Sequence, residues 1–207
     1  KFLTHKYHHT LCNIKQTATL SSQLKVVYYM AKGDTFFLRT SFNTSGTDYV
    51  SDNIDISAYT DPARGRVLVV DKAFVSFSTD GGGPILGPDI DAVIGGRSLG
   101  AQACSEKQTA LVTMSDNSLF MRSNLYASNT VNDAGGVGTI GLMEETSALN
   151  PAEYTGGFII PTDAIHCGVD AQVAWTAELK VGFMFEVHTE KLSLQRIQEL
   201  LVSLTAN

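Results

Sequence analysis

Charged side chains are scarce in this sequence: they make up 17% of its 207 residues, against roughly 25% in an average soluble domain. The surface must therefore be covered by Ser, Thr, Asn and Gly, or be buried against other chains. Acidic residues are absent from the first 33 positions, which carry five lysines, whereas residues 34–207 hold ten basic and 21 acidic side chains. A basic arm on an acidic body predicts two kinds of neighbour, a polyanion at the arm and further copies of the chain around the body.

Cysteines and long apolar runs are also few. The three cysteines, Cys12, Cys104 and Cys167, are an odd number with wide spacing, which argues against a disulfide framework or a cysteine-rich zinc site. We expect reduced, mostly buried thiols in a protein made in a cytosol-like compartment. No apolar run approaches the roughly 20 residues that cross a bilayer, and no signal peptide is recognisable. Because the sequence starts at Lys1, any longer basic tail would lie upstream of it.

Runs rich in β-branched and aromatic residues follow one another along the chain and predict strands. The clearest is Arg66–Thr79, whose second half alternates between Ala73, Val75 and Phe77 on one face and Phe74, Ser76 and Ser78 on the other. Two long Gly-rich loops are expected at 80–105 and 128–154. The remaining predicted strands are 18–31, 35–42, 54–59, 108–114 paired with 118–127 through Asp116-Asn117, 157–161, 164–169 and 173–188.

The period changes after His188. Apolar residues recur at helical spacing from Leu194 to Leu204, and Ser193 is a plausible N-cap. This pattern predicts a short amphipathic helix at the C-terminus. Its apolar stripe is expected either to dock on a neighbouring subunit or to cover the chain's own core, and the sequence does not decide between the two.

Motifs for catalysis are not evident. The Gly-rich segments at 81–84 and 95–96 lack the Lys-Ser/Thr of a phosphate-binding loop, and no Gly-x-Ser-x-Gly nucleophile elbow occurs. His166 and Cys167 are adjacent, but neighbouring strand residues point to opposite faces, so the two side chains should not meet. We therefore expect no enzymatic activity.

Metal binding has two weak candidates. His5, His8, His9 and Cys12 would share one face of a helix and suit zinc, but the segment has no strong helix signal and is more simply a polar arm. The acidic pairs Asp52/Asp55 and Asp89/Asp91 resemble no EF-hand loop and are expected to be solvated loop carboxylates. No cofactor or metal is predicted.

Seven to nine strands at hairpin-like intervals, without alternating helices, favour an all-β antiparallel β-sandwich or closed barrel. We divide the chain into a basic arm (1–17), a sandwich domain (18–190) and a C-terminal helix (191–207).

Several of these features together resemble the single jelly-roll capsid proteins of small icosahedral viruses. They are the acid-free arm 1–33, the long strand Arg66–Thr79 with its lead-in IDISAYTDPARGRVLVV, the two Gly-rich loops, and the final strand 173–188. The resemblance implies an eight-stranded jelly roll whose copies form a closed shell in the virion. It also implies that Lys1, Lys6 and Lys15 face the packaged genome through contacts with phosphates that do not depend on sequence.

Two departures from this family are visible. The arm has only dispersed lysines where many such proteins have an Arg-rich tail, and a minimal jelly roll does not need a C-terminal helix. For that helix we predict an intersubunit contact through Leu194, Ile197 and Leu201. The alternative function is a ligand- or receptor-binding β-sandwich, such as a fibre head, a lectin-like module or a trimeric cytokine-like fold, which explains the strands and loops equally well but not the acid-free arm.

Overall fold

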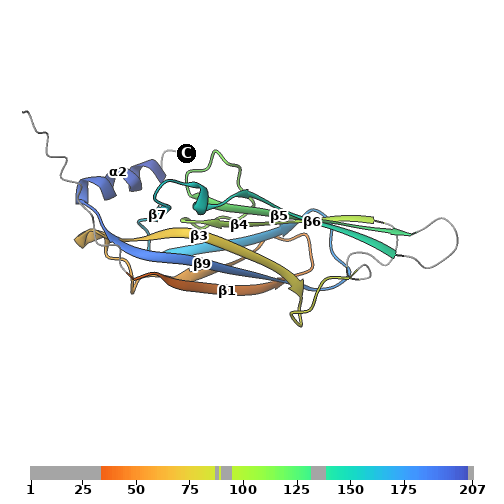
Figure 1. Cartoon of the computed structure of the whole chain (residues 1–207). Helices are drawn as coiled ribbons and strands as arrows, with labels where there is room; N and C mark the ends of the chain where they lie inside the picture. The colour runs from red at the N-terminus through yellow and green to blue at the C-terminus, as the bar shows by residue number, and fades with distance from the viewer. Residues whose placement is uncertain (1–33, 87–88, 90–94, 132–138, 205–207) are drawn as a thin grey trace, which may run out of the picture.

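Two antiparallel β-sheets pack face to face, with a short helix at one end (Figure 1). A computed structural model of the chain describes residues 34–86, 89, 95–131 and 139–204. The four-stranded sheet has the order β1-β9-β3-β7 and the five-stranded sheet the order β2-β8-β4-β5-β6. The elements are β1 Phe36–Thr44, β2 Val50–Asp55, η1 Pro62–Arg64, β3 Arg66–Thr79, β4 Gly95–Cys104, β5 Leu119–Val131, β6 Thr139–Leu149, η2 Pro151–Glu153, β7 Phe158–Ile160, β8 Ala164–Ala171, β9 Leu179–Lys191 and α2 Leu194–Leu204.

The strand pairing is that of a jelly roll with one extra strand. With β6 left aside, the first of the remaining eight strands pairs with the last, the second with the seventh, the third with the sixth and the fourth with the fifth. This pattern is a long antiparallel ribbon rolled into two sheets, which is the jelly-roll arrangement of two Greek keys. The extra strand β6 pairs with β5 at the edge of its sheet, and the β5–β6 hairpin extends beyond the other strands in Figure 1.

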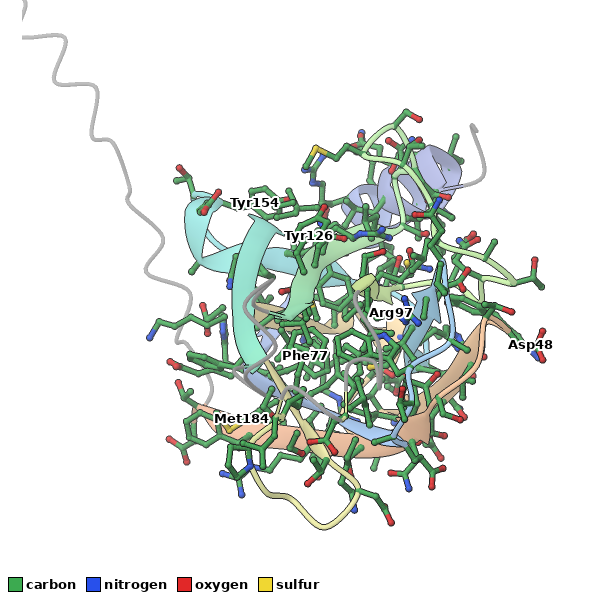
Figure 2. All side chains as sticks on the ribbon, turned by 90° about the vertical axis from the view of Figure 1, so that its right-hand side faces the viewer. Asp48, Phe77, Arg97, Tyr126, Tyr154 and Met184 are labelled. Atoms are coloured by element: carbon green, nitrogen blue, oxygen red, sulfur yellow. The ribbon has the colours of Figure 1, made fainter. Side chains whose placement is uncertain are left out.

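Strand alternation explains the core. On β9 every second residue from Leu179 to Val187 is buried, and on β3 the inward residues Ala73, Val75 and Phe77 oppose them. Phe120 joins this cluster from the other sheet and stacks edge-on against Phe185. In the end-on view of Figure 2, Phe77 lies between the sheets, whereas Met184 points away from the interior.

The first half of β3 is buried on both faces, which accounts for its uninterrupted apolar run. Residues 67–70 are fully inaccessible to solvent, and the 3-10 turn η2 packs against this strand. A β-bulge follows at Asp71, where the carboxylate lies 2.6 Å from Nδ1 of the buried His188. After the bulge, strict alternation resumes, as the sequence pattern predicts for this half of the strand.

Two predicted loops and one predicted strand are wrong. The segments 80–105 and 128–154, expected to be long loops, contain the strands β4 and β6. Conversely, residues 108–114, expected to form a strand, have irregular backbone, and within them Val112 N–H donates to the side chain of Gln102. The short strand predicted at 54–59 lies earlier, at Val50–Asp55, and the final strand begins at Leu179, not at 173. The strand predicted at 18–31 lies outside the described residues.

Candidate interaction surfaces

The C-terminal helix α2 forms as predicted, with Ser193 as its N-cap. The Ser193 hydroxyl accepts from the N–H of Arg196 at 3.2 Å, and its carbonyl accepts from the N–H of Ile197. The chain enters the helix after Leu192 N–H donates to the Gly65 carbonyl at 2.8 Å. This contact fixes the start of α2 beside η1, at the end of the sandwich shown at the left of Figure 1.

The structure divides the three helix residues that were predicted to contact another subunit. Ile197 is only 3% exposed, whereas Leu194 and Leu201 are 55% and 39% exposed. Leu204 is buried like Ile197, and both lie outside the main cluster between the sheets. These four positions share one apolar stripe of the helix. Ile197 and Leu204 pack against the rest of the chain, whereas Leu194 and Leu201, one heptad apart, remain partly exposed, and Val202 is more exposed still.

The predicted nucleic-acid contacts Lys1, Lys6 and Lys15 lie outside the described residues, as do the histidines of the possible zinc group. Among the residues that the structure does describe, no group of three or more His, Cys, Asp or Glu side chains is arranged to hold a metal ion. Asp52 accepts a hydrogen bond from Thr40 at 2.7 Å, and Asp55 accepts from the N–H of Ser57.

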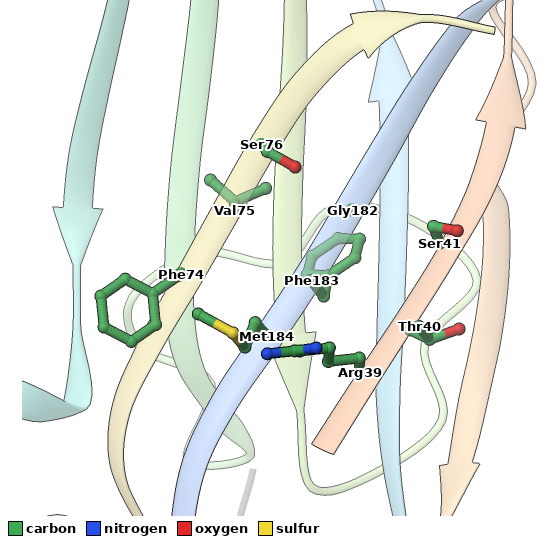
Figure 3. Close-up of a pocket in the computed structure, with 9 residues that line it drawn as sticks. All are labelled: Arg39, Thr40, Ser41, Phe74, Val75, Ser76, Gly182, Phe183 and Met184. Atoms are coloured by element: carbon green, nitrogen blue, oxygen red, sulfur yellow. The ribbon is translucent and has the colours of Figure 1, made fainter. Parts of the chain in front are cut away.

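A surface that the sequence analysis missed lies on the outer face of the four-stranded sheet. Here β1, β9 and β3 surround a groove of about 480 Å³ (Figure 3). Arg39, Met184 and Phe74 are direct cross-strand neighbours in one row of the three strands, and their side chains stand side by side over the sheet in Figure 3. We refer to Phe37, Arg39, Phe74 and Met184 as the outer-face patch.

The patch combines exposed aromatic surface with flanking charge. Phe37 is 53% exposed and Phe74 is 44% exposed. In the row next to Met184, Lys72 Nζ lies 3.0 Å from Glu186 Oε2, and Phe37 pairs with Glu186 on the opposite side. An apolar centre with aromatic, methionine and arginine side chains and a charged rim is the composition typical of protein–protein interfaces.

Gly182 and Ser76 line the next row of the groove. A Cβ at Gly182 would lie 2.8 Å from the hydroxyl oxygen of Ser76, so the absence of a side chain at position 182 leaves room for the Ser76 hydroxyl. The sequence did contain a signal for the patch: Phe74 has the same parity as Ser76 and Ser78, and is therefore an aromatic residue on the polar face of its strand.

The thiols of the sandwich are buried. Burial raises the pKa of Cys104 to about 12, although a hydrogen bond with Ser118 acts in the opposite direction. Burial also raises the pKa of Cys167 well above its ordinary value. Cys167 points into the core, whereas the neighbouring His166 lines a small polar hollow with Lys107. As predicted, the two side chains face opposite sides of β8, so no thiol–imidazole pair forms there.

Comparisons with known proteins give only remote structural likeness. No protein-family model matches the chain, and no curated protein matches it in sequence. A solved chain of turnip yellow mosaic virus is similar over 77% of this chain and 95% of its own length, with 9% identity and a TM-score of 0.29. The tailspike protein of Acinetobacter baumannii phage AM24 is similar over 76% of this chain and 26% of its own length, with 7% identity and a TM-score of 0.21. Both scores are low, so neither match bears on function.

Within the described part of the chain, the helices are too short or too polar to span a membrane.

Proposed function

We propose that this chain is a coat protein whose copies assemble into a closed icosahedral shell around nucleic acid. The body would form the shell wall, and the basic N-terminal arm would face the interior. The protein would act by assembly and not by catalysis, because many moderate contacts repeated by symmetry add up to a closed particle.

The outer-face patch is the observation that carries this proposal. Phe37 and Phe74 are about half exposed on the sheet face that also carries Met184, and a cluster of exposed apolar side chains is a candidate site of association. The second exposed apolar site, Leu194 and Leu201 on α2, emerges from another element of the same chain. A subunit of a closed shell needs at least two distinct contact surfaces, because each copy meets several neighbours.

The fold and the charge distribution support the same function. Jelly rolls are one of the architectures used for capsid domains, although they serve other functions as well. Residues 1–33 carry five lysines and no acid, whereas the remainder has eleven more acidic than basic residues. Lys1, Lys6 and Lys15 would attract phosphates in a salt-dependent way without reading sequence, and the acidic body would not compete for the same polyanion.

Negative-stain electron microscopy of the purified protein tests the coat-protein proposal, with absorbance at 260 and 280 nm measured on the same fraction. Uniform closed particles that carry nucleic acid are the expected result. Replacing Lys1, Lys6 and Lys15 by Gln should then lower the 260/280 ratio while the particles remain. Closed but empty wild-type particles would keep the shell and refute the role of the arm.

The second candidate function is a ligand-binding β-sandwich module, and a cavity lined by Arg122, Asn124 and Asp170 on the outer face of the five-stranded sheet is the observation that favours it. A small, monodisperse species without nucleic acid, persisting across salt and pH, would refute the shell and favour this alternative.

A further inference from the structure

A cavity of about 420 Å³, lined by both polar and apolar groups, lies on the outer face of the five-stranded sheet, on the opposite side of the sandwich from the outer-face patch. Its walls come from β4, β5 and β8 and from Leu111 in the segment between β4 and β5. Several chemically distinct groups line it, among them Arg122, Asn124, Tyr126 and Asp170. Figure 2 shows Tyr126 on the side of the molecule formed by this sheet.

Position 100, on β4 in the wall of the cavity, has no side chain. A Cβ at Gly100 would lie 2.7 Å from Cδ1 of Leu111 and 2.9 Å from Nη2 of Arg122. The absence of a side chain at this position therefore lets Leu111 and Arg122 lie close over the strand. In the register of the sheet, Gly100 is the direct neighbour of Asn124 on β5 and of Asp170 on β8.

The arginine in the cavity is held in place before any ligand arrives. Arg122 Nε donates to Oδ1 of Asn124 at 3.2 Å, and Nη1 donates to Oε1 of Gln102 at 3.4 Å. Burial lowers the pKa of Arg122, but a guanidinium stays protonated at neutral pH. A half-buried, oriented cation is a strong hydrogen-bond donor. Because its side chain is already ordered in the folded protein, a ligand loses little affinity to side-chain conformational entropy when it binds there.

A fully buried glutamine supports this wall. Gln102 donates to the hydroxyl of Tyr49 and to the carbonyl of Ala110, both at 2.9 Å, and accepts from the N–H of Val112 at 2.8 Å. These bonds tie the segment that carries Leu111 onto the sheet. Leu111, which lines the cavity, is thus held in position by the buried side chain of Gln102 through hydrogen bonds to its two neighbours in the chain.

The lining narrows the class of ligand. Among the residues that the structure describes, no direct ion pair joins Arg122 to Asp170, although the carboxylate is close enough to favour the charged guanidinium. The cavity thus offers a cationic donor and an anionic acceptor beside apolar surface. The Asp170 carboxylate disfavours phosphates and other anions, and the two charged groups disfavour a purely apolar ligand. A rigid ring with several hydroxyl groups matches donors and acceptors spaced in this way. Tyr126, which is 50% exposed, provides a flat apolar surface for the C–H face of such a ring.

We propose that this cavity binds a neutral saccharide, with Arg122, Asn124 and Asp170 bonding its hydroxyl groups and Tyr126 covering one face of the ring. The inference does not rest on the proposed shell function, because binding can be measured on a monomer or on an assembled particle.

Saturation-transfer-difference NMR on the full chain tests the inference, with the methyl glycosides of glucose, galactose, mannose and N-acetylglucosamine as probes and inorganic phosphate as a competitor. Transfer to at least one glycoside, not displaced by phosphate, is expected. Gly100→Ala, whose methyl group would displace Leu111 and Arg122, and Asp170→Asn, which preserves shape, should each weaken binding at least tenfold. Arg39→Gln, on the opposite sheet, is the matched control and should bind as wild type.

Thermal melting of each variant separates loss of the site from loss of the fold. If Gly100→Ala melts early, Asp170→Asn alone decides the question. Absence of transfer from all four glycosides would overturn the inference, as would transfer that both cavity variants retain or that phosphate abolishes.

Discussion

The outer-face patch allows a quantitative test of assembly through the double variant Phe37→Ser/Phe74→Ser. Complete burial of a phenylalanine side chain contributes about 1.5–3 kcal/mol, and these two side chains are 53% and 44% exposed in the isolated chain. If association covers what is left, each contributes about 1 kcal/mol, or about 2 kcal/mol together. Since every 1.4 kcal/mol is a tenfold change in affinity, that contact should weaken roughly 30-fold.

The assay is the protein concentration at which particles appear, followed by light scattering and checked by electron microscopy. The threshold should rise by at least an order of magnitude in the double variant, because each subunit loses the contact. Phe37→Leu/Phe74→Leu is the matched control, since it retains most of the apolar area and should assemble close to the wild-type threshold. Circular dichroism and melting temperature must show that both variants are folded. An unchanged threshold for the folded serine variant would refute the assignment of this face to a subunit contact.

The remaining predictions concern stability and titration. Ile197→Ala should destabilise the folded chain by about 2–5 kcal/mol, whereas Leu201→Ser, at a side chain that is 39% exposed, should cost less, about 1–2 kcal/mol, but raise the assembly threshold. An Ile197→Ala variant that loses no more stability in urea unfolding than Leu201→Ser would contradict the assignment of Ile197 to the covered part of the apolar stripe. Gly65→Ala should lower the melting temperature, because Gly65 has φ 85° and a Cβ there would lie 2.4 Å from the carbonyl oxygen of Leu192; a variant as stable as wild type would refute this. Burial raises the folded-state pKa of Cys104 above that of the free thiol, so the contribution of the neutral buried thiol to stability is present below pH 9.0 and is lost as the pH rises to about 12. In urea unfolding between these pH values, the stability of Cys104→Ala should fall less steeply with pH than that of the wild type. Identical slopes would contradict this titration of Cys104.

The sequence predicted correctly those elements whose structure depends on residues close together in the chain. The alternation along the second half of Arg66–Thr79 predicted which side chains enter the core, because a strand buried on one face repeats every two residues. The C-terminal helix and its cap at Ser193 were predictable for the same reason, since a helix and its first hydrogen bonds involve residues no more than four apart.

The failures came from segments whose structure depends on distant partners. Strand β4 has the sequence GGRSLGAQAC, with little intrinsic strand preference, and its glycines read as loop punctuation. It is a strand because β5 and β8 pair with it on both sides and Leu99, Ala101 and Ala103 face the core. Residues 108–114 show the reverse case. Their composition favours a strand, but their backbone is irregular, and the N–H of Val112 donates to the side chain of Gln102.

The sequence by itself determined an all-β body, a C-terminal amphipathic helix and the separation of charge between arm and body, because these follow from composition and short-range periodicity. Only the tertiary structure decided the jelly-roll strand order and which residues of the apolar stripe of α2 the rest of the chain covers. It also decided the meeting of Phe74, Met184 and Arg39 on one face and of Gly100, Asn124 and Asp170 on the other. Each of those features joins residues that are far apart in the chain. Their proximity is set by hydrogen bonding between strands and by packing of the two sheets, and no local pattern encodes either.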